Sequence, residues 1–133
     1  CYLVDVCDYL GDAEHAATLY DMLLPYADLT VMLGNATVCL GATSRFLGQL
    51  ASTMARWHDA EAHFEHALAL NGRMEAVPWI AHTRFQYSRE LMRRGRREDA
   101  ERAVLLLDES ISAARQHGMY GLLSRIKDGA VAI

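Results

Sequence analysis

The sequence contains few of the residues that mark disulfide-rich or membrane-spanning proteins. Its 133 residues include three cysteines and two prolines, and no two cysteines form a Cys-x-x-Cys pair. A small secreted scaffold would need more cysteines, so we expect reduced thiols and a cytoplasmic location. The longest stretch without a charged residue, between Asp28 and Arg45, carries several polar residues. It is too short and too polar to cross a bilayer, so we expect no membrane partner.

The first third of the chain has no cationic residue. Residues 1–44 contain six acidic residues and no Lys or Arg, whereas residues 45–133 contain 13 basic and 11 acidic residues. The net charge is −4. An acidic protein is a poor general binder of nucleic acid, because attraction to phosphate needs a positive surface.

The usual sequence signatures of catalysis are also missing. The chain contains no G-x-x-x-x-G-K-[ST] phosphate loop, no G-x-G-x-x-G, no H-E-x-x-H and no G-x-S-x-G. These motifs carry nucleotide, metal and nucleophile chemistry. We therefore expect neither an enzyme nor a bound cofactor.

Helical periodicity is present throughout the chain, and strand signals are scarce. Leu3, Val4, Cys7 and Leu10 recur at i, i+1, i+4 and i+7, which is one face of a helix. Similar patterns, bounded by Gly, Pro and acidic capping residues, predict helices over 3–10, 13–24, 36–55, 59–70, 78–94, 98–117 and 119–127. The prediction is an all-α fold of about seven helices in antiparallel pairs.

Two glycines stand out inside the predicted helix 36–55. Gly41 and Gly48 are seven residues apart and would share one face of that helix. Glycine costs about 1 kcal/mol relative to alanine inside a helix, so the pair indicates a closely packed neighbouring helix.

Three segments of the chain align at intervals of 44 and 40 residues. Each has a tight turn, then a small residue, a larger apolar residue four positions later and another apolar residue three positions after that. The three sets are Ala16, Tyr20 and Leu23; Ala60, Phe64 and Ala67; and Ala100, Val104 and Leu107. In the third segment, Ala103, Leu107 and Ser110 offer a second register. Internal repeats of this kind indicate stacked supersecondary units.

This pattern resembles the tetratricopeptide repeat, and the middle segment carries the resemblance best, with Leu47-Gly48, Ala51, Ala60, Phe64 and Ala67. The resemblance implies one right-handed helical-repeat solenoid over residues 1–133, in units of about 1–30, 36–72 and 77–118 with a partial unit 119–133. The string from Phe46 to Asn71, followed by Pro78-Trp79, is also similar to the C-terminal helical region of large bacterial AAA-type or STAND-type signalling ATPases. Those proteins carry LuxR-type DNA-binding or nucleotide-cyclase-like domains.

The second resemblance implies a fragment of a larger bacterial regulator that serves as a sensor or interaction arm. Its partner would be a protein, a peptide or another domain of the parent chain. In tetratricopeptide arrays the first helix of each pair lines a concave groove. Carried over to this sequence, the groove positions are Asp5, Asp8, Tyr9, Arg45, Gln49, Ser52, His82, Phe85, Arg89 and Arg93. A peptide or small polar ligand could bind there, but the same face could also be bare or covered by neighbouring repeats.

Three alternatives remain open at this point. An arginine-rich segment could bind an anion or nucleic acid through Arg84, Arg89, Arg93, Arg94, Arg96 and Arg97. His63 and His66, with Asp59 four residues before His63, could hold a metal in a metal-dependent enzyme. Open solenoid ends would expose apolar surface, and a homodimer could form through them.

Overall fold

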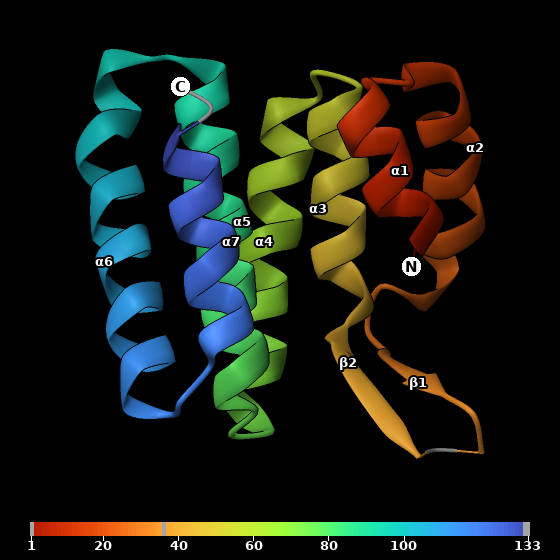
Figure 1. Cartoon of the computed structure of the whole chain (residues 1–133). Helices are drawn as coiled ribbons and strands as arrows, with labels where there is room; N and C mark the ends of the chain where they lie inside the picture. Colours follow the sequence, from red (N-terminus) through yellow and green to blue (C-terminus); the bar gives the residue numbers. More distant parts are fainter. Residues whose placement is uncertain (1, 36, 132–133) are drawn as a thin grey trace. The chain divides into compact units, whose positions relative to one another are not determined.

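The computed structural model describes residues 2–35 and 37–131, which form seven α-helices and one β-hairpin (Figure 1). The mostly helical fold and the number of helices confirm the prediction at that level. The chain divides into two compact units, residues 1–75 and 76–133. Cys1, for which a reduced thiol is expected, and Ala36, the predicted start of a helix, lie outside the described residues. None of the helices in the described ranges combines the length and apolar character needed to cross a membrane.

The first unit begins with two helices joined by a tight turn. Helix α1 spans Tyr2–Leu10 and helix α2 spans Ala13–Leu23, as predicted (Figure 1). Gly11 takes a left-handed conformation with φ of 66°, which ends α1. The side chain of Asp12 then accepts a hydrogen bond from the His15 backbone N–H and caps α2. Pro25 lies in a short 3₁₀ helix, Leu24–Tyr26, directly after α2.

A β-hairpin follows, and it replaces part of a predicted helix. Strand β1, Thr30–Leu33, pairs antiparallel with strand β2, Val38–Ala42 (Figure 1). The predicted helix 36–55 is therefore wrong over residues 38–42. Gly41 has a φ of 81°, a left-handed conformation that the interior of a helix does not contain. Gly41 and Gly48 consequently do not share a helical face.

The remainder of the first unit is a pair of longer helices. Helix α3 spans Thr43–Thr53 and helix α4 spans Trp57–Arg73. Gly48 on α3 faces the fully buried ring of Phe64 on α4, so the close helix packing predicted for Gly48 is confirmed. Asn71, also fully buried, accepts a hydrogen bond from the Ala42 N–H at 3.1 Å and ties the base of the hairpin to α4.

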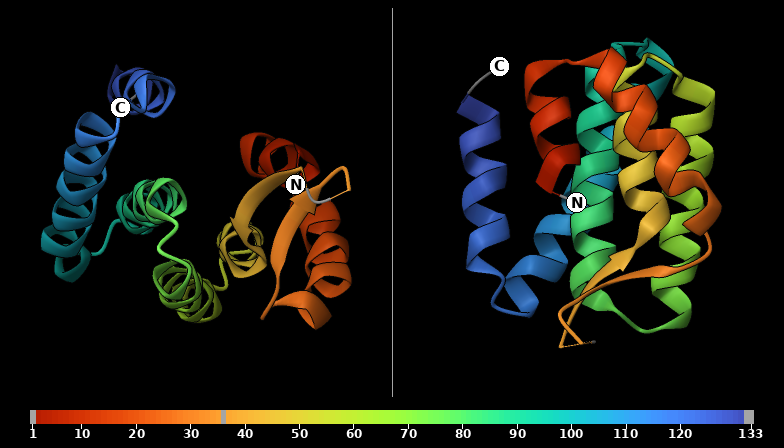
Figure 2. Two further views of the ribbon diagram at one scale, coloured as in Figure 1. Left: turned by 90° about the horizontal axis from the view of Figure 1, so that it is seen from below. Right: turned by 90° about the vertical axis from the view of Figure 1, so that its right-hand side faces the viewer.

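The second unit contains three helices. Helix α5 spans Val77–Arg94, helix α6 spans Ala100–Gln116 after a 3₁₀ turn at Arg97–Asp99, and helix α7 spans Tyr120–Val131 (Figure 2). Gly95 ends α5 in the left-handed conformation, as the sequence predicted. The core of this unit is built from Ala81, Phe85, Ala114 and Leu122.

The repeat alignment places the wrong residues inward in α6. Ala100 and Val104 are exposed, whereas Ala103 and Ser110 are buried, so the second register is the one that packs. The Ser110 hydroxyl donates to the Ala81 carbonyl on α5 at 2.8 Å. The 3₁₀ turn uses residues 97–99, so α6 begins only at Ala100 and its packed face starts one turn later.

Candidate functional site

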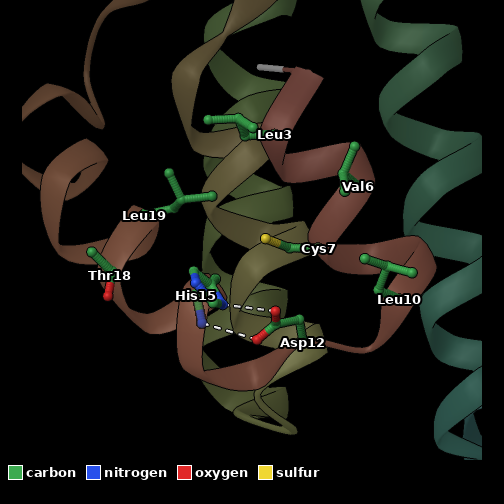
Figure 3. Close-up of a pocket in the computed structure, with 8 residues that line it drawn as sticks. All are labelled: Leu3, Val6, Cys7, Leu10, Asp12, His15, Thr18 and Leu19. Carbon is green, nitrogen blue, oxygen red and sulfur yellow. Dashed lines mark hydrogen bonds and ion pairs between the residues drawn. The ribbon is translucent and has the colours of Figure 1, made fainter.

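An apolar groove lies between α1 and α2 in the first unit (Figure 3). Its volume is about 280 Å³. Helix α1 supplies one wall, and α2 with the turn before it supplies the other. The lining residues are Leu3, Val6, Cys7, Leu10, Asp12, His15, Thr18 and Leu19.

The exposed wall of this groove comes from the width of the apolar stripe on α1. Val4 and Cys7 point inward and are buried, while Leu3, Val6 and Leu10 are 64%, 50% and 66% exposed. The sequence places Leu3, Val4, Cys7 and Leu10 on one face of this helix, but only Val4 and Cys7 of the four are buried. The sequence does contain a signal for this exposure. The apolar residues of α1 cover more of the helix surface than one packed face can bury, so some of them must remain exposed.

Two polar residues of the groove, Asp12 and His15, lie at the start of α2. The His15 ring nitrogen Nδ1 is 2.7 Å from Asp12 Oδ2, and the His15 backbone N–H bonds the other carboxylate oxygen (Figure 3). The backbone hydrogen bond, followed by the contact with the His15 ring, lowers the pKa of Asp12. Asp12 therefore keeps its negative charge at the groove.

Cys7, Asp12 and His15 are residue types found in nucleophilic sites, but their electrostatics do not activate the thiol. Burial, and then the negative charge of Asp12, raise the pKa of Cys7. A catalytic cysteine needs a lowered pKa, because the thiolate is the nucleophile. Cys7 consequently contributes an apolar, protonated side chain to the groove.

The structure brings together two of the residues predicted to line a ligand groove. Gln49 on α3 donates a hydrogen bond from Nε2 to Asp5 Oδ1 on α1 at 3.4 Å. Asp5 and Tyr9 are exposed, and Asp8 is half-buried.

The other predicted groove positions on α3 are buried, which corrects their assignment to an open surface. Arg45, Gln49 and Ser52 all lie inside, because α3 packs against α1, α2 and α4 within its unit. The Arg45 guanidinium donates to the Leu40 carbonyl at 3.2 Å and stacks on the Phe46 ring. These polar side chains help hold the unit together.

In the second unit, Phe85 belongs to the core, which again corrects a predicted groove position. His82 lies against the Trp79 ring, with centroids 5.4 Å apart. Arg89 and Arg93 both pair with the buried carboxylate of Glu90, at 3.2 and 2.6 Å.

Three more arginines of the proposed anion-binding segment, Arg84, Arg94 and Arg96, are also paired with carboxylates. Arg84 contacts Glu109 at 3.0 Å, and Arg96 contacts Glu98 at 3.6 Å. The pair between Arg94 and Asp99 is buried on both sides, and the hydrogen bonds from Arg94 lower the pKa of Asp99. These pairs reduce the positive potential that a phosphate would meet at this segment.

The three residues of the proposed metal site have separate partners. Asp59 pairs with Arg56 at 2.7 Å, and His66 lies 3.1 Å from Asp28. His63 Nε2 lies 2.7 Å from the hydroxyl of Tyr20 on α2, and burial lowers the pKa of His63. Over residues 2–35 and 37–131, no cluster of three or more His, Cys, Asp or Glu could hold a metal ion.

Comparisons with known proteins give no further assignment. No protein-family model, curated protein or solved structure matches this chain.

Proposed function

We propose that this chain is a non-catalytic protein-interaction module, and that its α1/α2 groove binds a helical segment of a partner protein. The exposed apolar wall formed by Leu3, Val6 and Leu10 is the observation that carries the proposal. Contiguous exposed apolar surface that lines a groove marks an interaction site more often than a solvated face.

The groove is better suited to bind the side chains of a partner helix than the backbone of an extended partner segment. Both walls are helices, whose backbone N–H and C=O groups are already bonded within each helix. A strand would find no free sheet edge there, whereas an amphipathic helix can insert apolar residues at i, i+3, i+4 and i+7. Helix α1 has nine residues, so a partner segment of about three turns would match its length.

The proposal includes a tetratricopeptide-like arrangement of helical pairs, as the sequence resemblance implies. The buried small residues Ala16 and Ala60, and the contact between Gly48 and Phe64, support it. The similarity to the helical arms of bacterial signalling ATPases supports a role as a sensor or coupling arm of a signalling or transcriptional regulator. In such a protein, binding in the groove would favour one conformation of the attached domains.

A display selection with helical peptides tests the groove. A library of random segments of about 15 residues, long enough to form a helix, is selected against the wild-type chain. We expect enriched peptides with an apolar stripe, whose affinity falls at least about tenfold in the Val6→Gln/Leu10→Gln variant, since two apolar contacts are lost. Leu105→Gln, at a residue on α6 that is 58% exposed, is the matched control and leaves the affinity unchanged.

Two results would reject the proposed function. The first is a selection that enriches no peptide above background. The second is a set of peptides that bind the groove variant as tightly as the wild type, when circular dichroism shows that the variant is folded.

A further inference from the structure

We propose that the partner of the α1/α2 groove is a cationic amphipathic helix, with Lys or Arg on either side of its apolar stripe. This inference rests on the proposed function and adds the charge of the partner. It follows from three observations on the first unit: the acidic residues beside the groove, the lack of Lys and Arg on both walls, and the ion pair between Arg56 and Asp59.

Acidic side chains lie along the α2 side of the groove. Glu14 and Asp21 are respectively four residues before and three residues after the lining residue Thr18, which places all three on one side of α2. Both carboxylates are exposed. Asp12 itself lines the groove, and its lowered pKa keeps it charged.

Neither wall contains a Lys or Arg that would neutralise these charges, and the one basic side chain in the lining, His15, contacts only Asp12 among them. Residues 1–44 have no Lys or Arg, and the whole first unit has ten acidic and three basic residues. Arg45 is buried, and Arg56 is paired with Asp59 and stacked on Tyr20. The groove therefore combines the apolar wall formed by Leu3, Val6 and Leu10 with a negatively charged edge on α2.

This combination selects among possible occupants. Anionic phospholipid headgroups and nucleic-acid phosphates carry negative charge, so the acidic edge repels both. A helix with an acidic or neutral polar face could pack on the apolar wall but would gain no ion pairs with the acidic edge. A helix with Lys or Arg beside its apolar stripe would satisfy both features and would associate faster at low salt.

Two designed peptides of about 15 residues provide the test, because helices of this length can form on binding. Both carry Leu at i, i+3, i+4 and i+7, and they differ only in that one has Lys and the other Glu at the flanking positions. Binding to the 133-residue chain is measured by fluorescence anisotropy. At about 50 mM salt we expect the Lys peptide to bind at least tenfold more tightly, and we expect added salt to shrink that ratio to below about threefold.

Variants that remove charge separate the contribution of the acidic edge to peptide affinity from that of the apolar wall. Glu14→Gln/Asp21→Asn should weaken the Lys peptide several-fold and leave the Glu peptide unchanged or slightly tighter. Glu98→Gln/Glu101→Gln, which makes the same charge change in the second unit, is the matched control and should have no effect. Val6→Gln/Leu10→Gln should weaken the binding of both peptides, because it alters the apolar wall without changing the charge.

The outcomes distinguish this inference from the function on which it rests. If both peptides bind equally and both lose affinity in Val6→Gln/Leu10→Gln, the groove is a docking site and the cationic partner is wrong. If neither peptide responds to that variant, the groove itself is wrong. If sedimentation shows that the wild-type chain self-associates and that this variant does not, the occupant is a second copy and the cationic partner is rejected.

Discussion

The ring of Phe64 on α4 lies against Gly48 on α3 so closely that a Cβ atom at Gly48 would be 3.0 Å from three ring carbons. Phe64 is fully buried, and in a close-packed interior a shift of its ring would displace neighbouring side chains. The contact explains why a glycine is placed inside a helix, where it is otherwise unfavourable. It sets the closeness with which α3 and α4 pack in the first unit.

Gly48→Ala should therefore destabilise the protein, although alanine is the better helix former. Overpacking of a core costs about 1–3 kcal/mol, which exceeds the gain of about 1 kcal/mol in helix propensity. We expect a lower midpoint of urea unfolding. Gly72→Ala is the matched control, because nothing lies within 4 Å of its added Cβ and the substitution should stabilise α4 slightly. Equal stabilisation by both substitutions would contradict the proposed contact.

Asn71 should be necessary for the attachment of the β-hairpin. Its side-chain oxygen accepts the Ala42 N–H in a fully buried position. Asn71→Leu leaves that N–H without its acceptor and should lower the free energy of unfolding by about 1–3 kcal/mol. Hydrogen exchange of the Ala42 amide should accelerate more than exchange in the core of α3. Ser124→Ala removes only an exposed 3.5 Å bond and serves as the control. An unchanged exchange rate at Ala42 would refute the assignment.

The buried pair between Arg94 and Asp99 should be far more sensitive to substitution than its exposed neighbour. Arg94 Nε donates to Asp99 Oδ2 at 2.6 Å, and both side chains are less than a tenth exposed. Arg94→Met leaves the Asp99 charge buried and should cost about 3–5 kcal/mol in thermal or urea unfolding. Arg96→Met, which breaks an exposed 3.6 Å pair with Glu98, should change the stability by less than about 0.5 kcal/mol. Similar losses of stability in the two variants would show that burial does not make the Arg94–Asp99 pair more important than the exposed pair.

His63 should make the stability of the protein fall between neutral and mildly acidic pH. Its pKa in the folded state is lowered from 6.5, chiefly by burial, although Asp59 acts in the opposite direction. The unfolded state therefore binds more protons below pH 6.5, and the free energy of unfolding decreases as the pH falls through that value. Below the folded-state pKa the loss is complete and the dependence on this group ends.

Urea unfolding of the wild type and His63→Gln at pH values on either side of 6.5, the ordinary pKa of histidine, measures this dependence. The wild type should be less stable on the acidic side, and the variant should lose most of the difference. Tyr20→Phe retains the buried imidazole but removes its 2.7 Å hydroxyl partner, so it should keep a pH dependence. A variant His63→Gln with the full wild-type pH dependence would exclude His63 as its source.

Much of the helical architecture could be predicted because its signals are local. Gly11 and Gly95 end helices where they stand in the sequence, and both take left-handed conformations. The burial of Tyr20 and Phe64 follows from their spacing after Ala16 and Ala60. Periodicity and capping depend on neighbours within a few residues, so one sequence is enough to identify them.

The candidate site was predicted less well, because exposure depends on which elements surround a helix. The sequence pointed to Arg45, Gln49 and Phe85 as open groove positions, and all three are buried. The sequence grouped Leu3 and Leu10 on one helical face with the buried residues Val4 and Cys7, but both border the open groove.

The sequence by itself determined the helical class, most of the helix ends and the concentration of acidic residues in the first 44 positions. Only the tertiary structure decided that residues 38–42 form a strand and that one side of α1 lies open beside α2. Local propensity acts between residues that are close in the chain, whereas an open or covered face is set by packing against segments distant in the sequence.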